Sequence, residues 1–279
     1  MRRNHIFVFE MKRLFTDQMN RSVEVAWPPK RIVSLVPSQT ELLYDLGLHN
    51  EVVGQTLFCI HPPEMHELKP RIGGTKNVNI EKVAALQPDL IIGNKEENDR
   101  QTIEALAKLY PVWMSDIQTL EDALEMIKQI GTLVNRDDQA QSIASNIQQS
   151  FADLQHPTSN LRNPKSNALY LIWRKPWMAA GHYTFINNML NRLGFHNVVQ
   201  SLDSRYPEIT DQQIQSLQPD VIFLSSEPYP FKAKHIEELQ AICPQATIKL
   251  VDGELFSWYG SRLLHSATYF RALLSSLAK

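Results

Sequence analysis

The chain contains an internal repeat. Residues 78–93 and residues 209–224 both carry Leu-Gln-Pro-Asp followed by an apolar run, and a second match lies upstream of each copy, at 46–50 and 193–197. Solenoid proteins repeat at about 20–50 residues, which is far shorter than this spacing. The repeat therefore predicts two similar α/β lobes in one chain, with a cleft between them.

Length and composition agree with a two-lobed soluble protein. The 279 residues exceed the size at which one core keeps growing, and the 43% hydrophobic and 21% charged residues are ordinary for a globular chain. The net charge of -2 gives no general attraction to nucleic acid or to an anionic membrane. The two cysteines, Cys59 and Cys243, have no metal-type spacing.

The N-terminus shows no export signal. Arg2 and Arg3 precede an apolar stretch at residues 6–9, which Glu10 ends. A secretory signal needs an apolar stretch of about 7–15 residues and a small-residue cleavage site, and a membrane span needs about 18 apolar residues. The sequence therefore predicts a soluble chain that is not visibly exported.

Strands and helices alternate in both halves, which favours parallel sheets with helices on their faces. The strands are expected at 31–36, 52–55, 90–92, 111–114, 168–172, 198–199, 221–224 and 248–251, and the helices at 38–46, 80–86, 98–109, 184–193, 211–217, 233–241 and near 261–276. Ser38 with Glu41 and Thr119 with Asp122 have capping-box spacing, and Asn79 precedes a helix.

The predicted domain boundaries follow from this pattern. An N-terminal extension or short hairpin covers residues 1–29, an N-terminal lobe 30–118 and a C-terminal lobe 168–279. Between the lobes we predict a connecting backbone helix over 119–155, which includes a second helical stretch from Asp137, and a polar linker over 156–167.

Large aromatic residues gather in the loops that follow the predicted strands, where open parallel sheets bind their ligands. Trp173, Trp177 and Trp258 lie there, interleaved with Arg174, Arg205 and Arg262. Rings and arginines together favour a platform for a bulky, flat, partly anionic ligand. The alternative is that the rings cap the ends of the sheets as extensions of the core.

A metal site and an enzyme active site are the alternatives to a ligand platform. Cys59 and His61 share one loop, and His182 and Glu227 lie in the other half, but Cys-x-His alone is a weak metal motif. His61 as one axial ligand to a metal inside a bound complex stays open. No GxSxG, P-loop or GxGxxG motif follows a strand, so no enzyme is predicted. Asp89 and Asp220 occupy equal places in the two repeats, which indicates a structural role.

The segment Arg31-Ile-Val-Ser-Leu-Val-Pro-Ser-Gln-Thr-Glu-Leu-Leu, residues 73–89, the helical connector and the second repeat resemble substrate-binding proteins of ABC importers for vitamin B12 and iron complexes. The resemblance covers residues 30–277. It implies the helical-backbone class: two Rossmann-like α/β lobes with parallel sheets, joined by a long α-helix.

Within that class the chain looks closest to the cobalamin-binding type. Phe58 and Tyr206 match aromatic ligand contacts of that type, whereas Thr75 and Asn94 stand where tryptophans are expected. The class docks its transporter through one exposed glutamate in each lobe. Glu81 matches in the first lobe, and Gln212 stands at the second position, with Glu208 nearby as a substitute.

The sequence thus predicts the substrate-binding component of an ABC importer, with a permease and an ATPase as partners. The ligand is a corrinoid or an iron chelate held between the lobes, and no intrinsic cofactor is expected. We expect a monomer in the periplasm or envelope; a cytoplasmic carrier or sensor of the same fold is the alternative. The candidate ligand-binding residues are Phe58, Cys59, His61, Thr75, Lys76, Asn94, Trp173, Arg174, Trp177, Arg205, Tyr206, Glu227, Tyr229, Phe256, Trp258, Tyr259 and Arg262.

Overall fold

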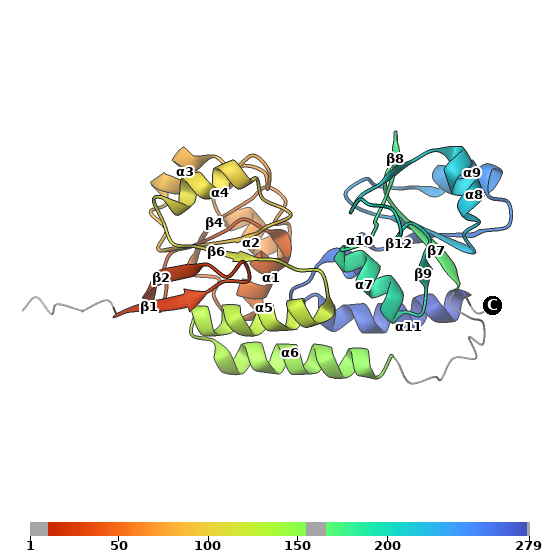
Figure 1. Cartoon of the computed structure of the whole chain (residues 1–279). Coiled ribbons are helices and arrows are strands. Elements are labelled where there is room, and N and C mark those ends of the chain that lie inside the picture. Colours follow the sequence, from red (N-terminus) through yellow and green to blue (C-terminus); the bar gives the residue numbers. More distant parts are fainter. Residues whose placement is uncertain (1–10, 155–165, 278–279) are drawn as a thin grey trace, which may run out of the picture. The chain divides into compact units, whose positions relative to one another are not determined.

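The chain folds into two α/β units, each with its own sheet, in a computed structural model that describes residues 11–154 and 166–277 (Figure 1). The first unit takes the chain up to Asp116 and then Glu125–Ala144. The second takes Ile117–Leu124 and the chain from Ser145 onward. The predicted linker at 156–167 lies almost entirely outside the described residues.

The first unit is built on a parallel sheet in the order β4-β3-β5-β6. Its strands are short apolar runs, and nearly all of their residues are buried, as parallel strands covered on both faces require. The strands are β3 (Ile32–Ser34), β4 (Val52–Gln55), β5 (Leu90–Asn94) and β6 (Val112–Ser115), and the helices among them are α1 (Pro37–Asp45), α2 (Pro63–Leu68), α3 (Ile80–Ala85) and α4 (Arg100–Ala107).

The first helix begins differently from the prediction. Ser38 does not cap α1, because the helix already starts at Pro37, with Val36 as a cap residue that makes no side-chain hydrogen bond. Proline suits this first position, since its fixed φ matches the helix and its missing N–H would have no partner there. The predicted caps at Asn79 and Thr119 are confirmed: their side-chain oxygens accept from the backbone N–H groups of Lys82 and Asp122, respectively.

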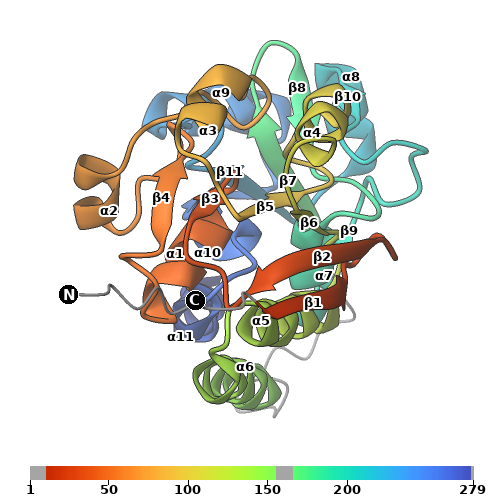
Figure 2. The same ribbon diagram turned by 90° about the vertical axis from the view of Figure 1, so that its left-hand side faces the viewer.

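A hairpin of β1 (Met11–Thr16) and β2 (Ser22–Trp27) precedes the sheet and lies beside α5 (Figure 2). Its turn is held by the buried carboxylate of Asp17, which accepts hydrogen bonds from Arg21 and from the backbone N–H of Met114. The indole N–H of Trp27 donates to the carbonyl of Thr132 on α5. The predicted N-terminal extension is thus part of the first unit from Met11 onward.

The segment predicted as the connecting backbone helix, 119–155, holds two helices, and the second begins at Asp137, where a second helical stretch was expected. Helices α5 (Leu120–Leu133) and α6 (Asp137–Ala152) run side by side (Figure 1). The chain reverses at Asn135, whose φ of 57° ends the first helix. The two helices meet closely at Gly131, where any added Cβ would lie 2.3 Å from the Cβ of Ala140.

The sheet of the second unit contains the predicted parallel strands and, in addition, short antiparallel ones. Strands β7, β9, β11 and β12 are parallel, but β8 runs antiparallel to β7, and β10 runs antiparallel to β8. The strands are β7 (Asn167–Trp173), β8 (Trp177–Ala179), β9 (His196–Asn197), β10 (Glu208–Ile209), β11 (Val221–Ser225) and β12 (Thr247–Val251), and the helices are α7 (Phe185–Arg192), α8 (Asp211–Leu217), α9 (Ala233–Ile242), α10 (Gly253–Ser257) and α11 (Leu263–Leu277).

The aspartate of the repeated Pro-Asp dipeptide has the same structural role in both units. The Asp89 carboxylate accepts from the backbone N–H groups of Lys30 and Arg31, at the start of β3. The Asp220 carboxylate accepts from the N–H of Asn167, at the start of β7. Each aspartate therefore links the start of the strand that follows it, β5 or β11, to the first strand of the same sheet, as the symmetry of the repeat predicts.

Within the described ranges, no helix has the length and apolar character that crossing a membrane requires.

Candidate functional site

The loops that follow the parallel strands carry the candidate site, and in each unit they leave one large ring exposed. In the first unit this ring is Phe58, after β4, which is 58% exposed. Its neighbours Leu57 and Ile60 are exposed as well. The Phe58 ring lies beside Gly74, where an added Cβ would come within 3.3 Å of it. The Phe58 ring thus lies against this glycine-containing loop.

Cys59 is a core residue, and the prediction that it binds ligand is wrong. It has no exposed surface, and its Sγ lies 3.0 Å from Thr40 Oγ1 and 3.1 Å from Thr56 Oγ1. Burial raises the pKa of its thiol to about 11. A buried, protonated thiol neither ligates a metal nor contacts a cargo molecule.

The remaining candidates of the first unit lie around the end of β5. Asn94 is buried, and its side chain holds the local turn: its amide donates to Ser115 Oγ, and its oxygen accepts from the backbone N–H of Glu96. Exposed Lys76 donates to the carbonyl of Glu96. Thr75 is half-buried, and so is His61.

Metal ligation by protein side chains gains no support from this arrangement. No group of three or more His, Cys, Asp or Glu side chains in the described ranges could hold a metal ion. His61 as an axial ligand to a metal within a bound complex stays a prediction.

In the second unit the exposed ring is Trp173, at the end of β7, which is 41% exposed. It packs edge-on against Tyr229, with ring centroids 5.6 Å apart, and Tyr229 packs in turn against Phe231 at 4.8 Å. Trp173 is thus held in place by an aromatic row and still presents surface to solvent.

Trp177 is largely enclosed by its own unit. It is 5% exposed and stacks on Phe231, with an interplanar angle of 9°. The guanidinium of Arg174 lies 4.4 Å from the centroid of its ring, and its indole N–H donates to Asp211 at 2.7 Å. This environment supports the alternative in which the ring caps the sheet.

Phe256 belongs to the aromatic core, and its assignment to the ligand site is wrong. It has no exposed surface, and its centroid lies 4.7 Å from that of Phe270, 5.0 Å from that of Tyr170 and 6.0 Å from that of Phe223. These rings come from β7, β11, α10 and α11, so the cluster joins the sheet to its covering helices.

The segment after α10 forms a polar network at the ends of β11 and β12. Glu227 Oε1 accepts from Ser257 Oγ and from the Trp258 indole N–H, both at 2.9 Å. Arg262 pairs with Glu254 at 2.8 Å and lies 4.8 Å from the Trp258 ring centroid. Trp258 and Tyr259 are both nearly buried, and Tyr259 packs edge-on against Phe185.

Burial raises the pKa of Glu227 above its usual 4.5, and the nearby charge of Glu254 acts in the same direction. As the pH rises through the raised pKa, ionisation is easier in the unfolded chain, so the carboxylate destabilises the fold. We expect the free energy of unfolding of the wild type to fall, relative to Glu227→Gln, as the pH rises from 4.5 toward neutrality. Urea unfolding across this range measures the difference. Exposed Glu237→Gln is the control, and a difference that is constant with pH would contradict the assignment.

The remaining candidates are two ligand-binding residues and the three residues predicted for docking. Arg205 and Tyr206 are half-buried, and the Arg205 carbonyl accepts from the N–H of Gly181. The three residues predicted for docking are exposed: Glu81 in the first turn of α3, Glu208 on β10 and Gln212 on α8. Their ligand and docking roles stay predictions.

Sequence reasoning missed one exposed ring. Tyr183 is 61% exposed, has a φ of 58°, and lies between β8 and α7. A tyrosine at positive φ is uncommon, and such residues concentrate at functional sites. Because it follows an antiparallel strand, a search of the loops after parallel strands does not find it. The sequence feature that indicates this position is that Tyr183 directly precedes Thr184, the N-cap of α7.

Comparison with known proteins identifies relatives over most of the chain. Residues 32–242 match the sequence profile of the family described as "Periplasmic binding protein". A vitamin B12-binding protein of Pectobacterium carotovorum is 26% identical over 255 residues, which cover 90% of both chains. The ABC transporter substrate-binding lipoprotein YvrC of Bacillus subtilis is 28% identical over 260 residues, which cover 89% of this chain and 81% of the relative.

Solved structures share the fold. The vitamin B12 binding protein BtuF of Vibrio cholerae superposes with a TM-score of 0.77 at 23% identity, covering 90% of this chain and 98% of its own. The apo heme-binding protein RhuT of Roseiflexus sp. RS-1 superposes with a TM-score of 0.79 at 21% identity, covering 90% and 99%. These likenesses establish the architecture of two α/β lobes with a helical connection.

Proposed function

Because the chain belongs to the periplasmic binding protein family, we propose that it is the substrate-binding component of an ABC importer and that its cargo is a corrinoid. Two relatives that align with most of the chain are named vitamin B12-binding protein and ABC transporter substrate-binding lipoprotein. They support the importer role and the cell envelope as its place of action, and the ligand class is argued from the side chains.

The observation that carries the proposal is the pair of exposed rings on the loops after β4 and β7. Phe58 and Trp173 are the rings of the predicted site that stay most exposed after each unit has packed its own core. Exposed aromatic surface on such loops is typical of a binding site for a large ligand with apolar faces. A corrin ring offers two such faces.

Two of the three candidate arginines favour a neutral ligand over an anionic one. Arg174 forms a bidentate ion pair with Glu238, and Arg262 forms an ion pair with Glu254. Arginines already neutralised by carboxylates have little attraction left for haem propionates or an anionic siderophore. Glu227, whose hydrogen-bond donors are the neutral side chains of Ser257 and Trp258, adds an acceptor. This environment suits the uncharged amide side chains of a corrinoid.

The docking surface of the first unit would be Glu81, an exposed carboxylate in the first turn of α3. In the second unit Gln212 holds the equivalent place on α8, and exposed Glu208 precedes that helix. We propose that the permease contacts Glu81 through cationic side chains and that Glu208 supplies the charge that Gln212 lacks.

Titration of the purified chain with cobalamin, cobinamide, haem and a ferric siderophore, followed by tryptophan quenching and calorimetry, tests the ligand class. We expect a corrinoid to bind at least about tenfold more tightly than haem or the siderophore, which corresponds to about 1.4 kcal/mol. Tighter binding of haem or the siderophore would overturn the corrinoid assignment and leave the importer role in place.

A further inference from the structure

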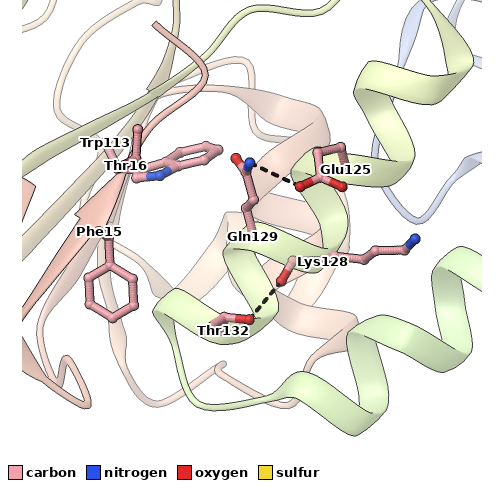
Figure 3. A pocket seen from close by; sticks show the side chains of 7 residues that line it. All are labelled: Phe15, Thr16, Trp113, Glu125, Lys128, Gln129 and Thr132. Carbon is pink, nitrogen blue, oxygen red and sulfur yellow. Dashed lines mark hydrogen bonds between the residues drawn. The ribbon is translucent and has the colours of Figure 1, made fainter. Parts of the chain in front are cut away.

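A small pocket in the first unit is separate from the loops of the proposed corrinoid site. It has a volume of about 240 Å³ and lies between the β1–β2 hairpin, the buried Trp113 of β6 and one side of α5 (Figure 3). Phe15 and Trp113 provide aromatic walls, and Gln129 of α5 projects toward the Trp113 ring.

The pocket offers one unused hydrogen-bond acceptor. Gln129 Oε1 is buried and accepts from no described residue. The orientation of its amide is fixed, because its Nε2 donates to the carboxylate of Glu125 at 3.1 Å. The reversed amide would bring oxygen against carboxylate and is therefore disfavoured. A buried acceptor without a donor costs free energy, so a ligand that supplies a donor gains affinity.

The opposite wall offers a donor. Trp113 is 1% exposed, and its indole N–H donates to no residue in the described part of the chain. A buried tryptophan usually has a partner for this N–H. The Trp113 indole N–H and Gln129 Oε1 thus provide a donor and an acceptor on walls that come from different elements, β6 and α5.

Size and charge limit what could bind. A pocket of about 240 Å³ equals about eight water volumes and is smaller than the range typical of drug-sized ligands. Glu125 and Lys128 bring one charge of each sign to its lining, so neither a cation nor an anion is favoured overall. Aromatic walls favour a flat molecule.

We propose that this pocket is a second binding site, specific for a small, uncharged, single-ring molecule with a carboxamide or lactam edge. The carbonyl of the ligand accepts from the Trp113 indole N–H, and its amide N–H donates to Gln129 Oε1. The ring packs against Phe15 and Trp113.

Nitrogen-edited NMR of the indole N–H groups tests the proposal, with nicotinamide as the probe. The chain has five tryptophans, and the Trp113 resonance is assigned by Trp113→Phe or, if that variant does not fold, by contacts to the Phe15 ring. We expect nicotinamide to shift the Trp113 resonance saturably. Nicotinate, which is charged and lacks the amide N–H, should bind at least about tenfold more weakly.

The matched variants are Gln129→Met and Gln139→Met. Gln129→Met keeps the length of the side chain but removes the acceptor, and it should weaken nicotinamide binding about tenfold. Exposed Gln139 lies on α6, and its substitution should change nothing. Shifts of several indole resonances, no saturation, or equal binding by Gln129→Met would each overturn the proposal. Cobalamin titration of Gln129→Met reports separately on the corrinoid site, which this change should leave intact.

Discussion

Phe256→Ala should lower the free energy of unfolding by about 3–5 kcal/mol, the range for removing a buried phenylalanine ring. Phe256 has no exposed surface and packs among Tyr170, Phe223 and Phe270. The cavity left by alanine cannot close easily, because the surrounding rings come from two strands of the sheet and from helix α11. Urea unfolding followed by circular dichroism measures the change.

Phe256→Leu is the control for this core assignment. It keeps most of the apolar volume and should cost clearly less than the alanine change. If Phe256→Ala kept wild-type stability and instead lost ligand binding, the sequence-based assignment of Phe256 to the ligand site would be correct after all.

Trp173→Ala should weaken cobalamin binding by about 1–3 kcal/mol, the range for losing the contact of one large ring. The effect on folding should be small, because the ring is 41% exposed and its described ring contact is Tyr229. Calorimetric titration gives the change in binding, and thermal unfolding of the same sample gives the change in stability.

Leu109→Ala is the matched control for Trp173→Ala. Leu109 is 62% exposed, directly follows α4 and its C-cap, and is not one of the candidate ligand-binding residues. Its substitution should leave cobalamin binding unchanged. Unchanged binding by Trp173→Ala, or its global unfolding, would show that the ring serves the second unit rather than a ligand.

The sequence predicts the parallel strands well because each is a short apolar run bounded by turn residues. Strand β4 and helix α8 have the predicted bounds, and most other predicted elements shift by one or two residues. The sequence pattern does not predict β8, β10, α2 and α10, which are six residues long or shorter. In such short segments, propensity and periodicity carry little information, and tertiary contacts decide the conformation.

The reversal between α5 and α6 is the feature of the connector that the sequence pattern does not reveal. The apolar spacing continues through both segments, so the pattern predicts helix on either side of Asn135 without revealing the reversal. The chain turns there because Asn135 adopts a left-handed conformation that asparagine tolerates. Gly131 then allows the two helices to approach closely.

The candidate site was predicted only in part, because a position after a strand does not tell a ligand contact from a core contact. Phe58 and Phe256 both follow strands, yet one is exposed and the other has no exposed surface. The difference lies in what covers each ring: α11 brings Phe270 onto Phe256, whereas Phe58 has an open loop beside it. Such covering contacts join residues distant in sequence and leave no local signal.

The most direct test of the account is a crystal structure of this chain with a bound corrinoid. The account predicts one corrinoid whose atoms lie within about 4.5 Å of both the Phe58 ring and the Trp173 ring, the usual limit for apolar contact. A corrinoid bound away from either ring would contradict it.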